Sequence, residues 1–390
     1  MITVEQALAE LFALVTPMQI EEIPLRAASG RVLARDVVAQ RSQPPFAASS
    51  MDGYALRRAE VEPDAMFKVV GEAAAGHRYN GTLRAGQAVR IFTGAPVPDG
   101  ADFVVIQEDV TRRGDLITLG HRIGEKDNIR PAGGDFTTGQ TVSAPLRLRP
   151  ADIALLAAMN VPIVPVFRKP VVAIIATGDE LVQPGEMPGP DQIIASNTYG
   201  LAAQLDALGA DARLMPIARD TTASLLRAFE LAQGADMIIT IGGASVGDHD
   251  LVAPVAAQLG MSQSFYKVAM RPGKPLMAGK LGGSIMVGLP GNPVSALVCG
   301  VVFVAPMLRA MLGLGQAAAP RRSVPLAVDM PANGPREHYM RASLVQGRVI
   351  PATQQDSSLL TVLAGANALL VRAADEPALN AGSMVEVIDL

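Results

Sequence analysis

The chain has 390 residues, of which 49% are hydrophobic and 18% are charged, the composition of a folded globular protein and not of a disordered one. Its 33 Lys and Arg residues stand against 37 Asp and Glu residues, a net charge of -4, so no nucleic acid partner is expected. The single cysteine, Cys299, excludes an intrachain disulfide, and the four histidines lack zinc-ligand spacing. A chain of this length is expected to form about two to four domains.

No membrane segment is expected from the hydrophobic pattern. The first residues carry charge early and lack the long apolar core of a signal peptide. The apolar stretch from Val294 to Leu308 is shorter than the ~18 to 20 residues that span a membrane, and it contains Pro306. We therefore expect a buried helix here and a cytoplasmic protein without a membrane partner.

The first part of the chain is expected to combine one helix with short strands. Thr3 and Gln6 form a capping-box pattern ahead of an apolar helical stretch that ends at Pro17. Residues 21–40 alternate short apolar runs around a Ser-Gly turn, which is typical of a β-hairpin or strand pair. Residues 67–142 are rich in glycine and short β-like runs, so a small all-β or mixed domain is expected there.

From Arg149 onward the pattern changes to helices and buried strands in alternation, which predicts an α/β domain with a mostly parallel sheet. A first helix is expected over Arg149–Met159, introduced by Pro150 and Asp152. Strands are then expected at 171–176, near 213–217, at 237–241 and at 284–287, and helices at 197–208, 222–233 and 251–259. Residues 323–390 return to short alternating runs, typical of a small β-barrel or sandwich.

Three of the predicted buried strands end in glycine and polar residues. The strand that begins at Val171 runs into Thr177 to Glu180, the next is followed by the glycine-rich stretch 242–250, and the last runs into the segment 288–293, GLPGNP. Since parallel strands bring their carboxyl ends to one edge, ligands of such folds bind there. We expect the site at this edge of the sheet.

The loop tips carry two kinds of charge. Acidic residues stand in several loops: Asp52, Asp135, Asp179, Glu180, Asp248 and Asp250. Crowded carboxylates repel one another unless a cation lies between them, so a hard ion such as Mg2+ is expected. The loop YKVAMRPGKP carries Lys267, Arg271 and Lys274 and suits a phosphate or other oxyanion, helped by backbone N–H groups at the start of the helix after GLPGNP. Magnesium and cations together indicate phosphoryl or nucleotidyl chemistry.

Ordinary structural roles remain open for several of these residues. A basic loop is often only a solvated surface, and Asp52 can be a turn residue. Asn197 and Asp220 each precede an apolar-periodic stretch and are candidate helix N-caps. The same role is expected for Asn292, because Pro293 then occupies the favoured first helical position.

Taken in order, the motifs resemble those of the molybdopterin molybdenumtransferase family, the MoeA proteins and the C-terminal domain of gephyrin. The resemblance rests on motifs in register over essentially the whole chain: SMDGYA at Ser50, IFTGAPVPDGADFVVIQED at Ile91, GGD at Gly133, ATGDEL at Ala176, IIASN at Ile193, GGASVGDHD at Gly242, KVAMRPGKPL at Lys267 and GLPGNPVSA at Gly288. The number of separate matches makes the resemblance specific.

The resemblance implies a multidomain α/β plus β subunit. Its parts would be a discontinuous linking domain at 1–43 and 142–168, a β-rich insertion domain at 44–141, a molybdopterin-binding α/β domain at 169–318 and a C-terminal β-barrel at 319–390. It also implies a homodimer in which the insertion domain of one subunit reaches the α/β domain of the other.

The activity implied is the insertion of molybdate into adenylylated molybdopterin with loss of AMP, assisted by Mg2+, which gives the molybdenum cofactor. Other cofactor-biosynthesis proteins and apo-molybdoenzymes would be further partners. Dithiolene sulfurs of the substrate would ligate molybdenum, in agreement with the single cysteine.

Site residues are carried over by motif. The catalytic set would be Asp52, Thr93 and Asp135 from the insertion domain with Glu180, Asp220 and Asp250 from the α/β domain, Glu180 and Asp250 being the metal ligands. Substrate would be bound by Gly242, Gly243, Ser245, Gly247, Asp248, Lys267, Arg271 and Lys274, with Pro290 and Pro293 shaping the loop beneath.

This chain departs from the family at three positions. Ala47 and Ala48 stand where an Asp-Asn pair is common, and Arg271 replaces the usual lysine before PGKP. A planar guanidinium fork is not equivalent to the point charge of a lysine when an oxyanion is bound.

Two other functions remain as alternatives. The adenylyltransferase of the same pathway shares the α/β domain, but GGASVGD stands here in place of a GGTG pattern followed by Pro-Arg-Asp, and the flanking domains are long. A scaffold or interaction protein of the gephyrin type is the second alternative, and the many charged loop residues argue against a purely structural role.

Overall fold

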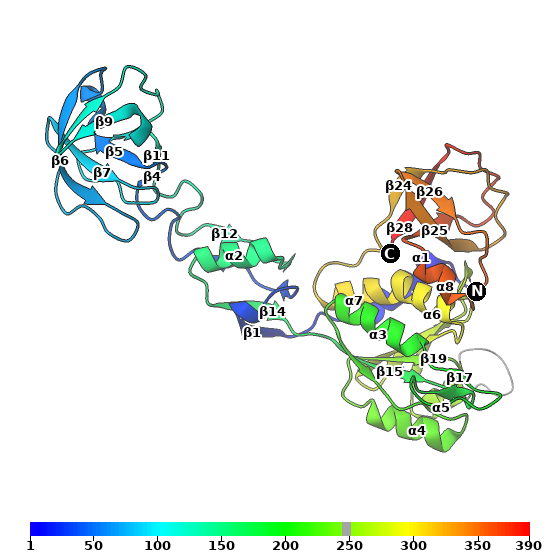
Figure 1. The fold of residues 1–390 in the computed structure, drawn as a ribbon. Helices are drawn as coiled ribbons and strands as arrows, with labels where there is room; N and C mark the ends of the chain where they lie inside the picture. Colours follow the sequence, from blue (N-terminus) through cyan, green and yellow to red (C-terminus); the bar gives the residue numbers. More distant parts are fainter. Residues whose placement is uncertain (244–250) are drawn as a thin grey trace. The chain divides into compact units, whose positions relative to one another are not determined.

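The computed structural model describes residues 1–243 and 251–390, and these form two compact units (Figure 1). The larger unit comprises Met1–Glu21, Gly30–Ala34 and Val166–Leu390, and the β-rich unit comprises Glu22–Ser29 and Arg35–Pro165. The chain is therefore multidomain, with a discontinuous path through both units, whereas the finer division into four domains remains a prediction.

The β-rich unit is built around a six-stranded mixed sheet, which accounts for the short β-like runs of the sequence. The strand order is β8 (Phe103–Ile106), β5 (Gly53–Leu56), β7 (Gln87–Ile91), β6 (Met66–Ala73), β10 (Leu116–Leu119) and β9 (Val110–Arg113). Strands β6 and β7 are parallel and the other neighbours are antiparallel. Its core is a cluster of its own that includes Phe67, Val89 and Ile117.

Short elements complete the β-rich unit. They are η1 (Leu25–Ala27), β3 (Val37–Val38), β4 (Ala48–Ser49), η2 (Arg58–Glu60), η3 (Gln107–Asp109), β11 (Ile129–Arg130), β12 (Thr141–Val142), β13 (Leu146–Arg147) and α2 (Pro150–Ala158). The predicted helix after Arg149 is confirmed as α2, with Pro150 in its first turn and Asp152 accepting hydrogen bonds from the backbone N–H and the guanidinium of Arg149.

The predicted hairpin over residues 21–40 is wrong. Strands β1 (Ile20–Pro24) and β2 (Val32–Leu33) do not pair with each other, because β14 (Ile163–Phe167) lies between them in a sheet of order β1-β14-β2-β13. Strand β3, also within this segment, pairs with β12. The local pattern identified strands but not their partners, which come from more than 100 residues further along the chain.

The larger unit contains the α/β domain. Its sheet has the order β18 (Asp211–Leu214), β15 (Val171–Ala176), β19 (Met237–Ile241), β23 (Ser284–Leu289), β22 (Met277–Leu281) and β20 (Ser262–Tyr266). The first four strands are parallel, as expected, and the last two form an antiparallel edge that the sequence analysis did not anticipate. Every residue of β19 is buried, as befits a central strand covered on both faces.

Helices cover both faces of this sheet (Figure 1). Helices α3 (Asn197–Ala207), α6 (Pro293–Cys299) and α7 (Ala305–Met311) share one core with Val172 and Ile239, and α1 (Val4–Leu14) joins the same core. Helices α4 (Thr222–Leu231) and α5 (Val252–Gln258) pack with Ala173 and Ile175 on the opposite face. Successive side chains of β15 point to opposite faces of the sheet, so the strand contributes residues to both hydrophobic cores. The capping box predicted at Thr3 and Gln6 is confirmed at the start of α1.

The apolar stretch after Pro293 is a core helix. Helix α6, the π-helical segment η4 (Gly300–Val304) and α7 make one run from Pro293 to Met311, long and apolar enough to cross a membrane by length and composition, but 78% of its apolar window is buried. The run is longer than predicted: it continues through Pro306, which lies two residues after the π-helical segment. Cys299 is buried within it, and that burial raises the pKa of its thiol far above the ordinary value.

The C-terminal segment forms a second sheet. The order is β21 (Met270–Arg271), β25 (Glu337–Val345), β27 (Ala368–Arg372), β28 (Met384–Asp389) and β24 (Arg322–Pro325), and β26 (Arg348–Pro351) pairs with β25. A short helix, α8 (Leu360–Ala364), precedes β27. Strand β21 comes from the predicted basic loop, and its Arg271 pairs in register with His338 of β25. The basic loop is thus held between the α/β domain and the C-terminal sheet.

Candidate functional site

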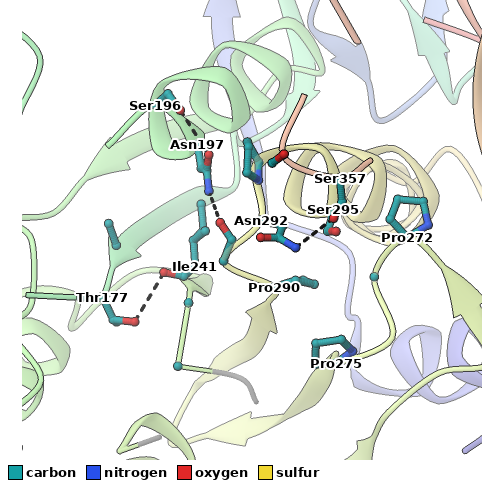
Figure 2. A pocket seen from close by; sticks show the side chains of 18 of the residues that line it. Thr177, Ser196, Asn197, Ile241, Pro272, Pro275, Pro290, Asn292, Ser295 and Ser357 are labelled. Atoms are coloured by element: carbon teal, nitrogen blue, oxygen red, sulfur yellow. Dashed lines mark hydrogen bonds between the residues drawn. The ribbon is translucent and has the colours of Figure 1, made fainter. Parts of the chain in front are cut away.

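The tips of the three buried strands line one pocket, with a volume of about 1010 Å³. Thr177, Gly178 and Glu180 follow β15, Gly242 and Gly243 follow β19, and Pro290 to Pro293 follow β23. The opposite wall comes from Arg271 to Pro275 and from the C-terminal residues Arg336 and Gln355 to Ser358. Figure 2 shows the polar side chains and prolines that face one another across this pocket.

Glycine is required where the β15 and β19 tips approach each other. The N–H of Thr177 donates to Ile241 O at 3.0 Å, and the N–H of Gly242 donates to Leu289 O at 3.1 Å, so the three tips are joined by backbone hydrogen bonds. Gly242 has φ +94°, and a Cβ there would lie 2.8 Å from the carbonyl oxygen of Thr177. A side chain would push the tips apart and is disfavoured by the backbone conformation as well.

The acidic wall is formed by Glu180 and Asp220. A Cβ on Gly178 would come within 2.2 Å of the Glu180 carboxylate, which shows that this carboxylate lies back over the glycine. The N–H of Asp220 donates to Asp179 Oδ1 at 3.2 Å, which links the two acidic loops. Neither Glu180 nor Asp220 forms an ion pair with the parts of the chain that the structure describes.

Asp220 is not the N-cap of the following helix. Thr221 occupies that position, with extended backbone angles, and its hydroxyl accepts from the N–H of Ser224 at 3.3 Å. The helix N-cap role is therefore excluded for Asp220, and its side chain lines the pocket instead.

The basic wall is formed by Arg271, Lys274 and Arg336. Arg336 donates from Nη1 to Met270 O at 3.4 Å, and none of the three pairs with a carboxylate within residues 1–243 and 251–390. Two of these cations act on the buried His338. Burial, followed by the charges of Arg271, Arg336 and two further arginines, lowers the pKa of His338 to about 4. Unpaired cations beside a neutral histidine make this wall suited to an anion.

Lys267 lies outside the pocket lining. Its Nζ is 5.1 Å from the centroid of the Tyr266 ring, a cation–π contact, and its backbone is held by hydrogen bonds to Ile2 and Leu276. It has φ +75°, an uncommon conformation for a side chain of this size. The structure thus brings Arg271 and Lys274 of the predicted basic triplet to the pocket but not Lys267.

Asparagine side chains connect three loops of the pocket (Figure 2). Asn197 Nδ2 donates to Gly291 O at 2.7 Å, and Asn292 Nδ2 donates to Ser357 Oγ at 2.9 Å. Asn292 does occupy the N-cap position of α6, as predicted, but its side chain makes no capping bond. Asn197 is the first helical residue of α3, and Ser196 occupies the cap position.

The remaining predicted residues fall elsewhere. Asp52 and Thr93 lie in the β-rich unit and are hydrogen-bonded to each other, and Asp135 lies in the same unit with its N–H donated to Gln43 O at 2.9 Å. Four predicted residues lie outside the described residues: Ser245, Gly247, Asp248 and Asp250.

Comparison with known proteins settles the family. The chain matches the MoeA N-terminal region (domain I and II) over residues 2–160, a probable molybdopterin binding domain over 173–310 and the MoeA C-terminal region (domain IV) over 323–390. A molybdopterin molybdenumtransferase of Nostoc sp. is 37% identical over 386 residues, covering 95% of this chain and 88% of that protein. The chain belongs to the molybdopterin molybdenumtransferase family.

Other members of the family support the same assignment. The molybdopterin molybdenumtransferase of Haemophilus influenzae is 36% identical over 320 residues, covering 81% of this chain and 79% of that protein. A crystal structure of a molybdopterin biosynthesis MoeA protein from Pyrococcus horikosii superimposes with a TM-score of 0.84 at 30% identity, over 100% of this chain and 98% of that one. The chain thus has the multidomain architecture of the MoeA proteins, which includes the α/β domain described above.

Sequence reasoning missed the C-terminal contribution to the pocket of this family member. Arg336 and the segment Gln355 to Ser358 line it, although no local motif pointed to them. The segment is held by Arg341, which is 1% exposed and donates from Nη1 to Asp356 O at 2.7 Å. The sequence offered one signal. Arg341 stands at an inward-facing position of an alternating strand, and an arginine is buried at such a position only where other groups accept its hydrogen bonds.

The carboxylates present are compatible with a magnesium ion but do not form a complete metal cluster in the described chain. Within residues 1–243 and 251–390, no three His, Cys, Asp or Glu side chains lie close enough together to hold a metal ion by themselves. Glu180 and Asp220 still offer two unpaired carboxylates on one wall, and oxygen ligands of this kind suit Mg2+, which commonly completes its coordination with water and substrate oxygens.

Proposed function

We propose that this chain, a transferase of molybdenum cofactor biosynthesis, inserts molybdate into adenylylated molybdopterin with release of AMP. The observation that carries the proposal is the pocket itself: unpaired carboxylates form one wall and unpaired cations the other, at the carboxyl ends of parallel strands. A substrate with a pyrophosphate and an incoming oxyanion needs both kinds of charge.

The basic wall binds the anionic groups. Arg271 offers a planar fork that can donate two parallel hydrogen bonds to one oxyanion, and Lys274 adds a point charge. Charge that shifts onto the phosphate of the departing AMP is stabilised by these fixed cations, since they are already in place before the bond to the molybdopterin phosphate breaks.

Magnesium is the proposed cofactor, held by Glu180 and Asp250, with Asp220 on the same wall as Glu180. Of these, Asp250 lies outside the described residues. A bound ion would neutralise charge on the pyrophosphate and orient it. Glu180 would then keep the ion at the strand tip, because its carboxylate lies over Gly178.

The proposed active form is a homodimer in which Asp52, Thr93 and Asp135 act in the pocket of the partner subunit. Support comes from family membership and from the location of these residues in the β-rich unit, whereas the pocket is lined by residues of the larger unit. Asp52→Ala and Glu180→Ala should each be inactive as homodimers, yet mixed dimers should recover part of the activity, because one of the two pockets then has no substitution. Absence of any recovery would count against a shared site.

Three further expectations belong to the proposal. The protein is expected in the cytoplasm, and apo-molybdoenzymes and other cofactor-biosynthesis proteins are its expected partners. The C-terminal sheet is expected to close as a barrel; the bridge between Leu326, just after β24, and Val349 of β26 supports this, since it joins the two edges of that sheet.

The deciding experiment measures AMP release from adenylylated molybdopterin by the purified protein with Mg2+, with and without molybdate. Release that depends on molybdate, with a product that activates an apo-molybdoenzyme, is the expected result. ATP-dependent adenylylation of molybdopterin would identify the adenylyltransferase instead, and no release under any condition would leave a scaffold protein.

A further inference from the structure

The loop that carries Glu180 is held on one side by a short strand pair. It joins β15 to β16 (Leu181–Val182), which pairs in parallel with β17 (Ile193–Ile194). The carbonyl oxygen of Glu180 accepts from the N–H of Ile193 at 2.7 Å. This side of the loop is therefore fixed by β17.

Arg219 takes up the carbonyl groups on the other side of the loop. Its Nη1 donates to Asp179 O at 2.9 Å and to Leu181 O at 3.1 Å, the residues before and after Glu180. Along a paired strand, alternate residues bond to opposite neighbours, so these two carbonyls face away from β17. The guanidinium thus stands where a further strand would pair, and its rigid group of donors allows it to serve both carbonyls.

The backbone of Arg219 is itself anchored. The preceding residue, Ala218, forms a parallel bridge with Thr177, and its carbonyl oxygen accepts from the N–H of Gly178 at 3.1 Å. The N–H of Arg219 donates to Ser224 Oγ, in the first turn of α4, at 2.9 Å. Arg219 therefore acts on the loop from a segment that is attached both to the tip of β15 and to a helix.

The same segment carries Asp220. Its N–H donates to Asp179 Oδ1 at 3.2 Å, and its side chain lines the pocket together with that of Glu180. The Glu180 carboxylate lies over Gly178, and this placement depends on the path of the loop between them. A loop that loses its outer hydrogen bonds to Arg219 would let Glu180 move away from Asp220.

We propose that Arg219 is a positioning residue, which holds the loop of Glu180 against the segment of Asp220 so that both carboxylates face the pocket. Arg219 is exposed and lies outside the pocket lining, so it acts through Glu180 and not on the substrate. The inference rests on the proposed function for what the carboxylates bind, a divalent cation. The hydrogen bonds that hold the loop do not depend on that function.

Hydrogen exchange, followed by mass spectrometry, tests the loop. Arg219→Met keeps the apolar part of the side chain and removes its donors, which within the described chain bind carbonyl oxygens and no carboxylate. We expect the amide of Ile193, which donates to Glu180 O, to exchange about tenfold faster, the effect of losing one hydrogen bond to a charged group. Arg227→Met, which removes an exposed ion pair with Glu230 on α4, is the matched control and should exchange as the wild type does.

Binding of Mn2+, followed by the EPR signal of the free ion, tests the site. Mn2+ serves as the probe because it takes the same oxygen ligands as Mg2+. Arg219→Met should weaken Mn2+ binding roughly three- to tenfold, and Arg219→Lys, which keeps the charge and a donor on a shorter side chain, should recover part of the loss. In a Glu180→Gln background, Arg219→Met should have little further effect, because the carboxylate through which Arg219 acts is gone.

The outcomes separate this inference from the proposed function. Unchanged exchange at Ile193 in Arg219→Met would overturn the inference, and so would equal losses of Mn2+ binding with and without the Glu180 carboxylate. A wild type that binds no Mn2+ would refute the proposed metal site, while faster exchange at Ile193 in Arg219→Met would still support the hold on the loop. A protein that shows both effects of Arg219→Met but releases no AMP would refute the proposed reaction and leave the inference standing.

Discussion

Asp52 accepts two hydrogen bonds from Thr93, one from the backbone N–H and one from the hydroxyl, both at 2.8 Å. The two residues are 41 positions apart, on loops at the ends of neighbouring strands β5 and β7. The backbone bond, then the hydroxyl bond, lowers the pKa of the Asp52 carboxyl below its ordinary value. The carboxylate is thus kept charged at more acidic pH than a free aspartate.

Thr93→Val should raise the pKa of Asp52 towards the ordinary value, because it removes the hydroxyl bond and keeps the side-chain shape and the backbone bond. Thr93→Ser, which retains the hydroxyl, should leave the pKa low. A carboxyl NMR titration of Asp52 measures both. In the wild type the stabilisation is present above the ordinary pKa and lost as pH falls through the lowered one. Identical titrations of Asp52 in the valine variant and the wild type would contradict the hydroxyl bond.

Gly242→Ala should destabilise the larger unit, because its Cβ would lie 2.8 Å from Thr177 O in a backbone conformation with φ +94°. The expected loss is about 1 to 3 kcal/mol of unfolding free energy. Gly291→Ala is the matched control in the same pocket, since its Cβ would have an ordinary 3.6 Å contact with Gly242 Cα. Thermal unfolding of both variants tests this, and equal melting temperatures would show that the strand tips adjust freely.

Asp236→Asn should weaken the start of the parallel sheet. The Asp236 carboxylate receives both guanidinium arms of Arg168, at 2.8 and 2.9 Å, and the N–H of Val171 at 2.7 Å. Burial acts to raise the pKa of Asp236, but these donors outweigh it and lower that pKa. We expect a loss of about 2 kcal/mol above pH 4, shrinking as the wild-type carboxylate is protonated in acid, measured by urea unfolding.

The control for Asp236 is the pair of Arg213 and Asp211, whose side chains are 55% and 47% exposed. Asp211→Asn should change the unfolding free energy by less than about 0.5 kcal/mol, because exposed ion pairs gain little over their contacts with water. A loss as large as that of Asp236→Asn would mean that the two pairs do not differ in the way their burial suggests.

The fold could be predicted where the sequence pattern is local. The parallel strands β15, β19 and β23 each read as a buried apolar run ending in glycine, and the structure places them side by side. Pairing between distant segments could not be predicted in this way. Strands β20 and β22 form the antiparallel edge, and their sequences contain polar residues and a glycine in place of a continuous apolar run. Their register is set by pairing with β23 and with each other, which their own hydrophobic pattern does not reveal.

The pocket was predictable as far as its strand tips and the loop containing Arg271 and Lys274. Arg336 and Ser357 were missed because they reach the pocket only through long-range contacts: β21 pairs with β25, and Ser357 binds the beginning of α6. Lys267 shows the opposite case. It stands in the same motif as Arg271, yet its side chain lies on Tyr266, outside the pocket lining.

His338 should give the unfolding free energy a slope between pH 4 and pH 6.5. It is 7% exposed, and burial, with Arg271, Arg336, Arg341 and Arg372 adding to it, lowers its pKa from 6.5 to about 4. Between pH 4 and pH 6.5 this histidine is therefore protonated in the unfolded chain but neutral in the folded chain. Its contribution to the unfolding free energy is fully present above pH 6.5 and is lost as pH falls towards 4. The expected loss is on the order of 3 kcal/mol. Urea unfolding at several pH values should show the slope in the wild type and a flatter profile in His338→Gln, with His77→Gln, at an exposed position, behaving as the wild type. A wild-type slope that survives in His338→Gln would assign it to another group.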